Sequence, residues 1–211
     1  MKLRYTPIAG YVHAVESVIN YAGLKRRIQP VATQPFDPAC DLWKDNPLGT
    51  VPTLILKDGR ALYGGPVIYA YLDSLHRKRK LFGQPGSKQS FEILRQLWLA
   101  DGVFDHFVRV GREANEPKKT HRRHTVTRNW IKVVRALDQL NRDAKDWTGA
   151  TLHIGQIRAM ASINFVDKYV AVMATMIKGL NGRFNWRKGR PHLARWHALW
   201  AGHKIFTTAL K

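Results

Sequence analysis

The stretch 48-LGTVPTLILKDGRALYGGPVIYAYLD-73 decides the fold. Thr53–Leu56 is a short apolar run that predicts a buried strand, "KDG" predicts a hairpin turn, and "RALY" predicts the partner strand. The apolar residues of Val67–Leu75 lie on one helical face, so a helix should follow. Two bare glycines, Gly64 and Gly65, stand where this helix would begin.

The residues before this stretch also alternate strands with helices. Lys2–Tyr5 reads as a short strand, and apolar residues recur at helical spacing from Val12 to Ala22. Gly23 is placed to end that helix, and a second strand is expected around Ile28–Val31. The order strand–helix–strand, then strand–strand–helix, predicts a mixed sheet with helices packed against it.

The pattern changes after the Gly- and Pro-containing segment Phe82–Gln89. Four long helical patterns follow, and none of the intervening segments reads as a strand: Phe91–Glu113, Arg122–Arg142, Ile154–Ile177 and Pro191–Phe206. The sequence therefore predicts an α/β domain over residues 1–80, a linker over 81–89 and an all-helical domain over 90–211.

Composition limits the class of protein. With 45% hydrophobic residues the chain can bury a core, and its single cysteine, Cys40, excludes an internal disulfide framework. The N-terminal sequence lacks the apolar region of a signal peptide, and no run approaches membrane-spanning length. A soluble cytoplasmic protein without a membrane partner is the expectation.

The chain is strongly basic, with 35 Lys and Arg against 15 Asp and Glu and a formal net charge of +20. The densest clusters are "HRKRK" (His76–Lys80) and "KKTHRRH" (Lys118–His124). Such a charge attracts polyanions. The clusters can equally be solvated loops and helix ends, and they show neither an RNA-binding motif nor interleaved aromatic residues.

Pro52 stands at the start of an otherwise buried strand, although proline cannot donate to a strand ladder. A cis Val51–Pro52 bond would turn the backbone of Val51 outward, where its N–H and C=O could pair with an extended peptide. At this point the sequence resembles the glutathione transferases: "NPLGTVPTLILKDGRALY…VIYAYLD" is similar to the family's N-P-x-G-x-V-P-x-L block with its hairpin and helix.

The resemblance covers nearly the whole chain. "KLRYTPIAGYVHAV" resembles the family's first strand and loop, and "NWRKGRPHLARWHALWAGHKIF" resembles its C-terminal segment. The resemblance implies a thioredoxin-like α/β domain followed by an all-α domain, usually in a homodimer. It also implies glutathione as co-substrate and a hydrophobic electrophile, which the glutathione thiolate attacks. A hydroxyl that donates to the sulfur favours the thiolate.

The chain departs from the family pattern in its first loop. Where the family has serine, this chain has Ala9, which carries no donor. Tyr5 and Thr6, at the end of the first strand, are the candidate catalytic hydroxyls, with a strand-packing role and a local backbone cap as their alternatives. Tyr11 is a candidate for the electrophile pocket or for packing, and His13 stands where the family often has arginine.

A second departure lies at the two glycines. Gly64 and Gly65 occupy the positions of an acidic-Ser pair that holds the γ-glutamyl group of glutathione in the family. The helix N-terminus would still offer backbone N–H groups to an anion. Ala9, Val51, Pro52, Gly64 and Gly65 therefore form the expected glutathione-binding set, although tight-turn geometry alone would also explain the glycines.

The helical half contributes two further candidates and one missing motif. Asp101 and Asp105 lie four residues apart on one helical face. The resemblance implies that Asp101 binds glutathione and that Asp105 borders the electrophile pocket, whereas an Asp105–Arg109 pair is the structural alternative. The family's S/T-x-x-D box, which opens its buried helix, is half absent, because Thr151 is followed by Ile154 at the acidic position.

Three functions stay open after these observations. The chain could be a glutathione transferase of weak activity, a non-catalytic protein that binds a ligand or partner through the same cleft, or a basic platform that binds nucleic acid or another polyanion. His121, His124 and Cys40 lack the spacing of metal ligands, so no metal site is expected.

Overall fold

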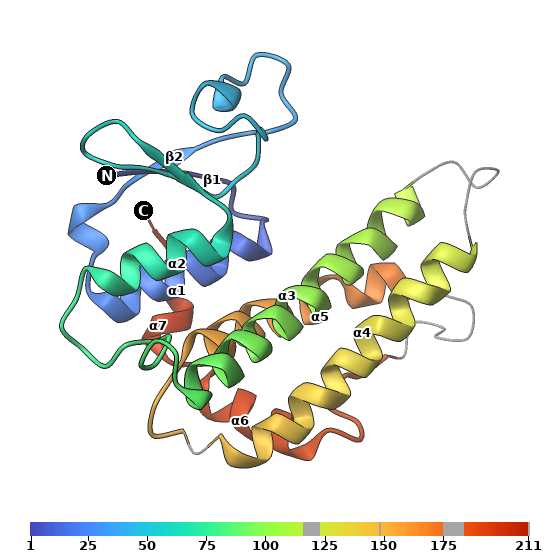
Figure 1. The fold of residues 1–211 in the computed structure, drawn as a ribbon. Coiled ribbons are helices and arrows are strands. Elements are labelled where there is room, and N and C mark those ends of the chain that lie inside the picture. Colours follow the sequence, from blue (N-terminus) through green and yellow to red (C-terminus); the bar gives the residue numbers. More distant parts are fainter. Residues whose placement is uncertain (116–122, 148, 175–183, 211) are drawn as a thin grey trace. The chain divides into compact units, whose positions relative to one another are not determined.

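The computed structural model describes residues 1–115, 123–147, 149–174 and 184–210 of the 211-residue chain. These residues form two compact units, Met1–Ser90 with Gly202–Lys211 and Phe91–Ala201 (Figure 1). Residues 118–122 of the basic cluster Lys118–His124 lie outside the described residues, and so do residues 175–177 of the predicted helix Ile154–Ile177.

The N-terminal unit contains a four-stranded mixed sheet. Its order is β2-β1-β3-β4, with β1 parallel to β2 and antiparallel to β3, and β3 antiparallel to β4. Helices α1 and α2 pack against each other and lie on the same side of the sheet in Figure 1. The elements are β1 Lys2–Tyr5, α1 Gly10–Ala22, β2 Gln29–Ala32, β3 Thr53–Ile55, β4 Ala61–Tyr63 and α2 Gly65–Ser74. The mixed sheet expected from the sequence is confirmed.

The core of this unit lies between the central strands and the two helices. Leu3 on β1 and Leu54 on β3 are cross-strand partners and are both fully buried. The buried face of α1 includes Val12, Val15 and Ile19, which recur at the helical spacing seen in the sequence. Gly23 ends α1 with φ at 72°, a left-handed conformation that glycine adopts without a steric penalty.

The last ten residues belong to the N-terminal unit, although the sequence placed them in the helical domain. The side chain of Asn20 on α1 donates to the carbonyl oxygens of Ile205 and Thr208. Glu16 accepts from the backbone N–H of Leu210, whose side chain is buried. These contacts join residues 185 or more positions apart, so no local sequence pattern announces them.

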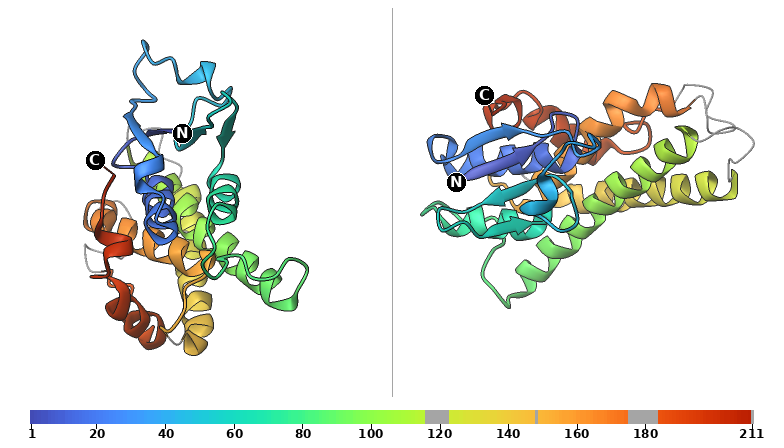
Figure 2. Two further views of the ribbon diagram at one scale, coloured as in Figure 1. Left: turned by 90° about the vertical axis from the view of Figure 1, so that its left-hand side faces the viewer. Right: turned by 90° about the horizontal axis from the view of Figure 1, so that it is seen from above.

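The helical unit contains long helices that run beside one another (Figure 2). Its aromatic core includes edge-to-face contacts of Phe165 with Phe104 and with Phe107. Trp98, by contrast, is 78% exposed. The helices are α3 Lys88–Asn115, α4 Arg123–Asp143, α5 Ile154–Ala174 and α6 Pro191–Trp200, the first of which starts in the preceding unit.

Two helix ends differ from the sequence expectation. The predicted helix Pro191–Phe206 is broken after Trp200, and a separate helix, α7 (Lys204–Thr207), begins where the His203 side chain accepts from the N–H of Ile205. At the start of α5, His153 and Gln156 form a reciprocal cap: His153 Nδ1 accepts from Gln156 N–H, and Gln156 Oε1 accepts from His153 N–H. The capping box is therefore complete, but it lies two residues beyond Thr151.

Candidate functional site

The strand register brings three parts of the predicted site to one end of the sheet. Thr53 at the start of β3 pairs with Arg4 on one side and with Tyr63 on the other. Because both pairings are antiparallel, the residues after Arg4 and after Tyr63 run alongside the residues before Thr53. Thr6, Val51 and Gly64 therefore lie at the same end of the sheet.

The Val51–Pro52 bond is cis, as predicted. Within the described part of the chain, neither the N–H nor the C=O of Val51 makes a hydrogen bond. Val51 is half-buried, and the strand ladder begins only at Thr53. A backbone donor and acceptor thus stand open at the start of a central strand, and they can pair with an extended peptide.

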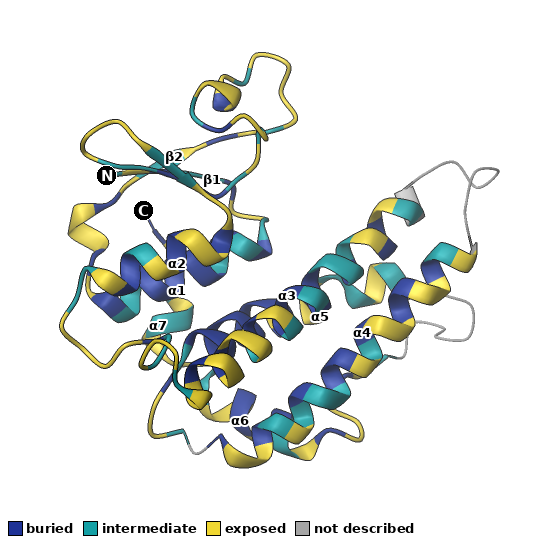
Figure 3. Ribbon diagram, viewed as in Figure 1, coloured by how far each residue is buried: buried dark blue, intermediate teal, exposed yellow. Residues whose placement is uncertain are grey.

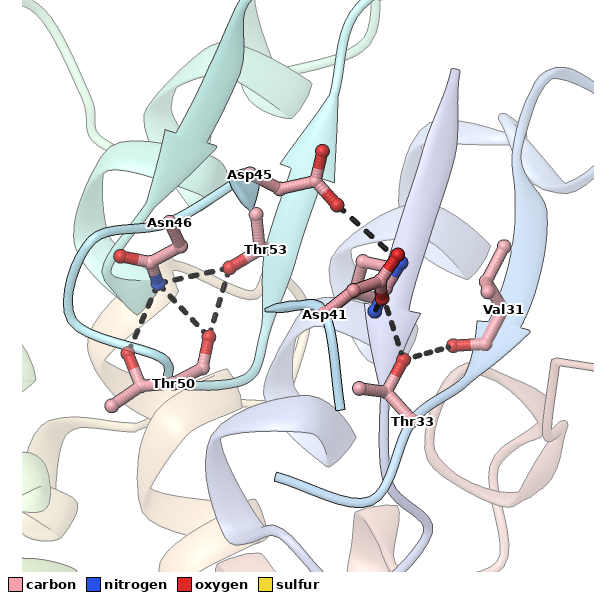
Figure 4. Close-up of polar contacts among 8 residues, drawn as sticks. Val31, Thr33, Asp41, Asp45, Asn46, Thr50 and Thr53 are labelled. Atoms are coloured by element: carbon pink, nitrogen blue, oxygen red, sulfur yellow. Dashed lines mark hydrogen bonds and ion pairs between the residues drawn. The ribbon is translucent and has the colours of Figure 1, made fainter. Parts of the chain in front are cut away.

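The loop before Val51 is organised by one buried side chain (Figure 4). Asn46 is fully buried, and its Nδ2 donates to the carbonyl and hydroxyl oxygens of Thr50 and to Oγ1 of Thr53 at 3.0–3.1 Å. Its Oδ1 accepts from the N–H of Leu48. Asn46 therefore fixes the path of residues 46–53, a role that sequence reasoning missed although the asparagine belongs to the recognised motif.

A second cluster holds the long polar loop that follows β2 (Figure 4). The guanidinium of Arg4 donates to Thr33 Oγ1 at 3.1 Å and to Asp41, and it lies 3.4 Å from Asp45. The hydrogen bond from Arg4 lowers the pKa of the Asp41 carboxyl below its ordinary value. Arg4 thereby anchors the loop to β1, beside the end of the strand that leads to the site.

The N-terminus of α2 has no side-chain cap. Gly64 is the N-cap residue with φ at 84°, which favours glycine, and Pro66 follows in the first turn. The N–H groups of Gly65 and Val67 make no hydrogen bond to another described residue. The helix end therefore presents backbone donors and the positive end of its dipole, and no side chain.

Gly65 is closely surrounded. A β-carbon built there would lie 2.7 Å from the Tyr69 hydroxyl oxygen and 2.9 Å from Cδ1 of Tyr11. Tyr69 is fully buried, and its hydroxyl donates to the carbonyl oxygen of Tyr11 at 3.5 Å. The two tyrosines occupy the space that a serine side chain would need, and this places the Tyr11 ring against the start of α2.

Residues 6–9 form the loop between β1 and α1. The Thr6 carbonyl accepts from the N–H of Ala9 at 3.1 Å, and Ala9 caps α1 without a side-chain hydrogen bond. Thr6 is only 7% exposed, yet its hydroxyl has no hydrogen-bond partner among the described residues, and the same holds for the hydroxyl of half-buried Tyr5. Thr6 is thus a nearly buried hydroxyl that caps no local backbone group.

His13 lies one turn into α1 and is not an isolated histidine. Its Nδ1 is 3.1 Å from Oε2 of Glu16, and 45% of its side chain is exposed. Glu16 also holds the backbone of Leu210 through its other oxygen. The first turns of α1 are therefore tied to the C-terminal segment.

Asp101 and Asp105 belong to the helical unit. Asp101 is 4% exposed and accepts a hydrogen bond from Nε of the fully buried Arg158. Burial raises the pKa of Asp101 above its ordinary value, although the charge of Arg158 opposes this rise. The carboxylate of Asp101 is thus committed to an ion pair inside its own unit, and Asp105 lies half-buried one turn later.

The cluster His76–Lys80 is partly committed to structure. Lys80 donates to the carbonyl oxygens of Asp73 and His76, and Lys78 donates to that of Tyr21, all at 2.6 Å. These carbonyls lie at or near the C-terminal ends of α2 and α1, where cations are favoured.

Two findings on metals and membranes concern the described ranges only. They contain no group of three or more His, Cys, Asp and Glu residues that could hold a metal ion. None of their helices is both long and apolar enough to span a membrane.

Comparisons with known proteins agree with the fold. Residues 10–75 match the family described as "Glutathione S-transferase, N-terminal domain". These residues therefore belong to that domain family, and the chain has the fold of the glutathione transferases. A comparison with curated proteins gave no match.

Two solved structures are similar over almost their whole length. A glutathione S-transferase from Methylobacillus flagellatus KT with bound glutathione is 25% identical, with 97% of this chain and 96% of that chain covered and a TM-score of 0.84. A glutathione transferase family member from Pseudomonas fluorescens Pf-5 with bound glutathione is 26% identical, with the same coverage and TM-score.

Proposed function

We propose that the protein binds glutathione at the end of the sheet where Thr6, Val51 and Gly64 lie, and transfers its thiolate to a hydrophobic electrophile. The observation that carries the proposal is the open backbone of Val51 beside the uncapped start of α2. Glutathione bound in the two similar structures supports it.

The residues present fit the peptide part of glutathione. The N–H and C=O of Val51 suit antiparallel pairing with its cysteinyl residue. The N–H groups of Gly65 and Val67 suit its γ-glutamyl carboxylate, which the dipole of α2 also attracts. The missing acidic-Ser pair removes two side-chain hydrogen bonds to charged groups, each worth about 1.5–3 kcal/mol, so affinity should be roughly 100-fold or more below that of a complete site.

For the sulfur, we assign Thr6 as the favoured hydroxyl and Tyr5 as the second candidate. A donor that faces the sulfur stabilises the thiolate after its proton has left to solvent. The thiolate then attacks an electrophilic carbon, so that a C–S bond forms while the bond to a leaving group such as halide breaks and the leaving group takes its electron pair. Ala9 supplies no donor to this step.

Tyr11 and Asp105 complete the proposed site. Tyr11 packs at Gly65, so its ring borders the glutathione end, and Asp105 keeps its proposed place beside the electrophile. Asp101 is not kept as a glutathione ligand, because its carboxylate is buried against Arg158. No metal takes part, and a cytoplasmic location, where glutathione is the main thiol buffer, suits the chemistry.

A homodimer is also proposed. Phe91, Leu94 and Trp98 lie at i, i+3 and i+7 on α3 and are 62%, 43% and 78% exposed. A stripe of large apolar side chains at this spacing suits a second copy of the chain. Sedimentation of the wild type and of Trp98→Glu tests this, since a dimer that becomes a monomer supports the interface, and a monomeric wild type refutes it.

The alternative is a non-catalytic protein that binds a ligand through the same site. The absence of a hydroxyl at Ala9 and the filled space at Gly65 favour it. Titration calorimetry with glutathione separates the cases when it is combined with conjugation of an aryl halide. Binding with turnover supports the transferase, and binding without turnover supports the alternative with glutathione as its ligand. No binding at millimolar glutathione rejects the transferase and leaves only a ligand other than glutathione.

A further inference from the structure

The solvent face of α4 carries a continuous row of cations. Arg128, Lys132 and Arg135 lie at i, i+4 and i+7, and all three are exposed. At about 100° per residue, the five basic residues of the row fall on an arc of about 80°. We call this row the α4 basic face: His124, Arg128, Lys132, Arg135 and Arg142. Figure 3 shows α4 with an exposed side and a buried side.

These charges are not neutralised locally. Arg128, Lys132 and Arg135 make no ion pair or hydrogen bond with another described residue. The two acids of α4 serve other cations, because Asp138 pairs with Arg190 at 2.6 Å and Asp143 pairs with Arg95 at 2.9 Å. Arg142 donates to Oε1 of Gln139, a neutral acceptor that leaves its charge uncompensated. The positive charges of the α4 basic face are therefore available to an external anion.

Other basic residues of the chain are used differently. Lys78 and Lys80 of the His76–Lys80 cluster donate to backbone carbonyls. Arg60 and Arg187 pair with Asp58 and Asp167. Against this background the α4 basic face stands out by the regular spacing of its cations along one helix.

The shape and chemistry of this face select the kind of anion. Arg128 to Arg142 span roughly 20 Å of helix at about 1.5 Å per residue, which is enough to meet several phosphates of one strand. Trp130 is buried, so α4 offers no exposed tryptophan, tyrosine or phenylalanine ring on which unpaired bases could stack. Among the described side chains of α4, Ile131 is the only large apolar one that is exposed. One such side chain is too little apolar surface for insertion into a lipid surface.

We propose that the α4 basic face binds the phosphate backbone of duplex nucleic acid without sequence preference. The binding does not depend on glutathione, because it uses another unit of the protein and a different chemistry. Counterion release from the duplex would supply most of the affinity, so the binding should weaken steeply with salt.

The test measures binding of a fluorescently labelled DNA duplex to the full chain by anisotropy over a series of salt concentrations. The variant Arg128→Gln/Lys132→Gln/Arg135→Gln should bind on the order of 100-fold more weakly near 0.1 M salt, and the slope of log affinity against log salt should fall by about 3. Thermal melting checks that the variant is folded.

The matched control is Lys57→Gln/Arg77→Gln/Arg79→Gln, which also removes three exposed positive charges but lies in the N-terminal unit. The control should bind within about threefold of the wild type. Equal losses in both variants would mean that net charge alone drives binding and would overturn the assignment. So would tighter binding of a single strand of equal length, binding only to anionic phospholipid vesicles, or a wild type that does not bind the duplex at physiological salt.

Discussion

A β-carbon at Gly65 would lie 2.7 Å from the hydroxyl oxygen of Tyr69, a separation that real β-carbons do not adopt. The glycine is therefore required by the packing around it, and the absence of serine from the proposed glutathione site is linked to a buried tyrosine one turn later. Restoring the family residue at position 65 requires a change at Tyr69 as well.

We expect Gly65→Ser alone to lower the melting temperature without improving glutathione binding, because the new side chain overlaps the Tyr69 and Tyr11 rings. Tyr69→Leu removes two of the three atoms nearest to the new β-carbon, and the Tyr11 ring, whose Cδ1 is 2.9 Å away, has only to shift. Gly65→Ser combined with Tyr69→Leu should therefore bind glutathione several-fold more tightly than Tyr69→Leu alone, by about 1 kcal/mol for one added hydrogen bond. Calorimetric titration measures both. Tighter binding by the single Gly65→Ser variant, with unchanged stability, would show that the packing does not exclude serine.

The hydroxyl of Thr6 is predicted to face the sulfur. Thr6→Val should lower the rate of aryl-halide conjugation by about tenfold or more, because a hydrogen bond to a thiolate is worth roughly 1–3 kcal/mol. The dissociation constant of glutathione should change little, since the thiol is bound before it ionises. Single-turnover rates and calorimetry separate these two effects.

Tyr5→Phe and Ala9→Ser complete the test of the sulfur site. Tyr5→Phe should leave the rate near that of the wild type, and Ala9→Ser should raise it, since it returns a hydroxyl to the loop. A large loss of rate in Tyr5→Phe with none in Thr6→Val would mean that Tyr5, and not Thr6, donates to the sulfur. No change in any of the three variants would place the sulfur elsewhere.

Much of this arrangement could be predicted from the sequence because it rests on local signals. The hairpin turn at Gly59, the cis Val51–Pro52 bond and the glycine that ends α1 are each specified by neighbouring residues. The resemblance to the glutathione transferases also indicated that Val51 and Gly64 would belong to one site. These features require only short-range backbone preferences and a buried apolar face.

The parts that the sequence did not predict depend on contacts between distant or shape-matched residues. The docking of residues 202–211 on α1 depends on Asn20 and Glu16, far away in the chain. The space at Gly65 is filled by Tyr69, whose helical position showed only that it would be buried. The family motif S/T-x-x-D placed the capping box of α5 at Thr151, whereas His153, an unusual N-cap residue, forms it with Gln156.

The position of the capping box at His153 leads to a stability prediction. His153→Ala should lower the free energy of unfolding by about 1 kcal/mol, because the N–H of Gln156 loses its acceptor, and His153→Ser should recover most of the loss. Thr151→Ala is the control and should change stability by less than about 0.5 kcal/mol, because Thr151 is exposed. Denaturant unfolding measures all three. A larger loss of stability for Thr151→Ala than for His153→Ala would show that Thr151 caps α5, as the family motif predicts.

Stability should fall as the solution is acidified, in part because of His197. Burial lowers the pKa of this imidazole below its ordinary value, the positive charge of Arg187 lowers it further, and Asp167 partly opposes both. Its ring packs edge-to-face on Trp186, and Nε2 lies 2.8 Å from Oδ1 of Asn164. Above the ordinary histidine pKa of about 6.5, folded and unfolded chains both carry a neutral His197, so its effect on stability is absent.

Below that pH the unfolded chain takes up the proton before the folded chain does, and the folded state loses stability until the pH has passed the lowered pKa. His197→Gln keeps a hydrogen-bond donor for Asn164 but cannot titrate. Its melting temperature, followed from about pH 8 to about pH 5, should decline less steeply than that of the wild type, while the other eight histidines titrate in both proteins. Parallel curves for the two proteins would mean that His197 contributes nothing to the acid sensitivity.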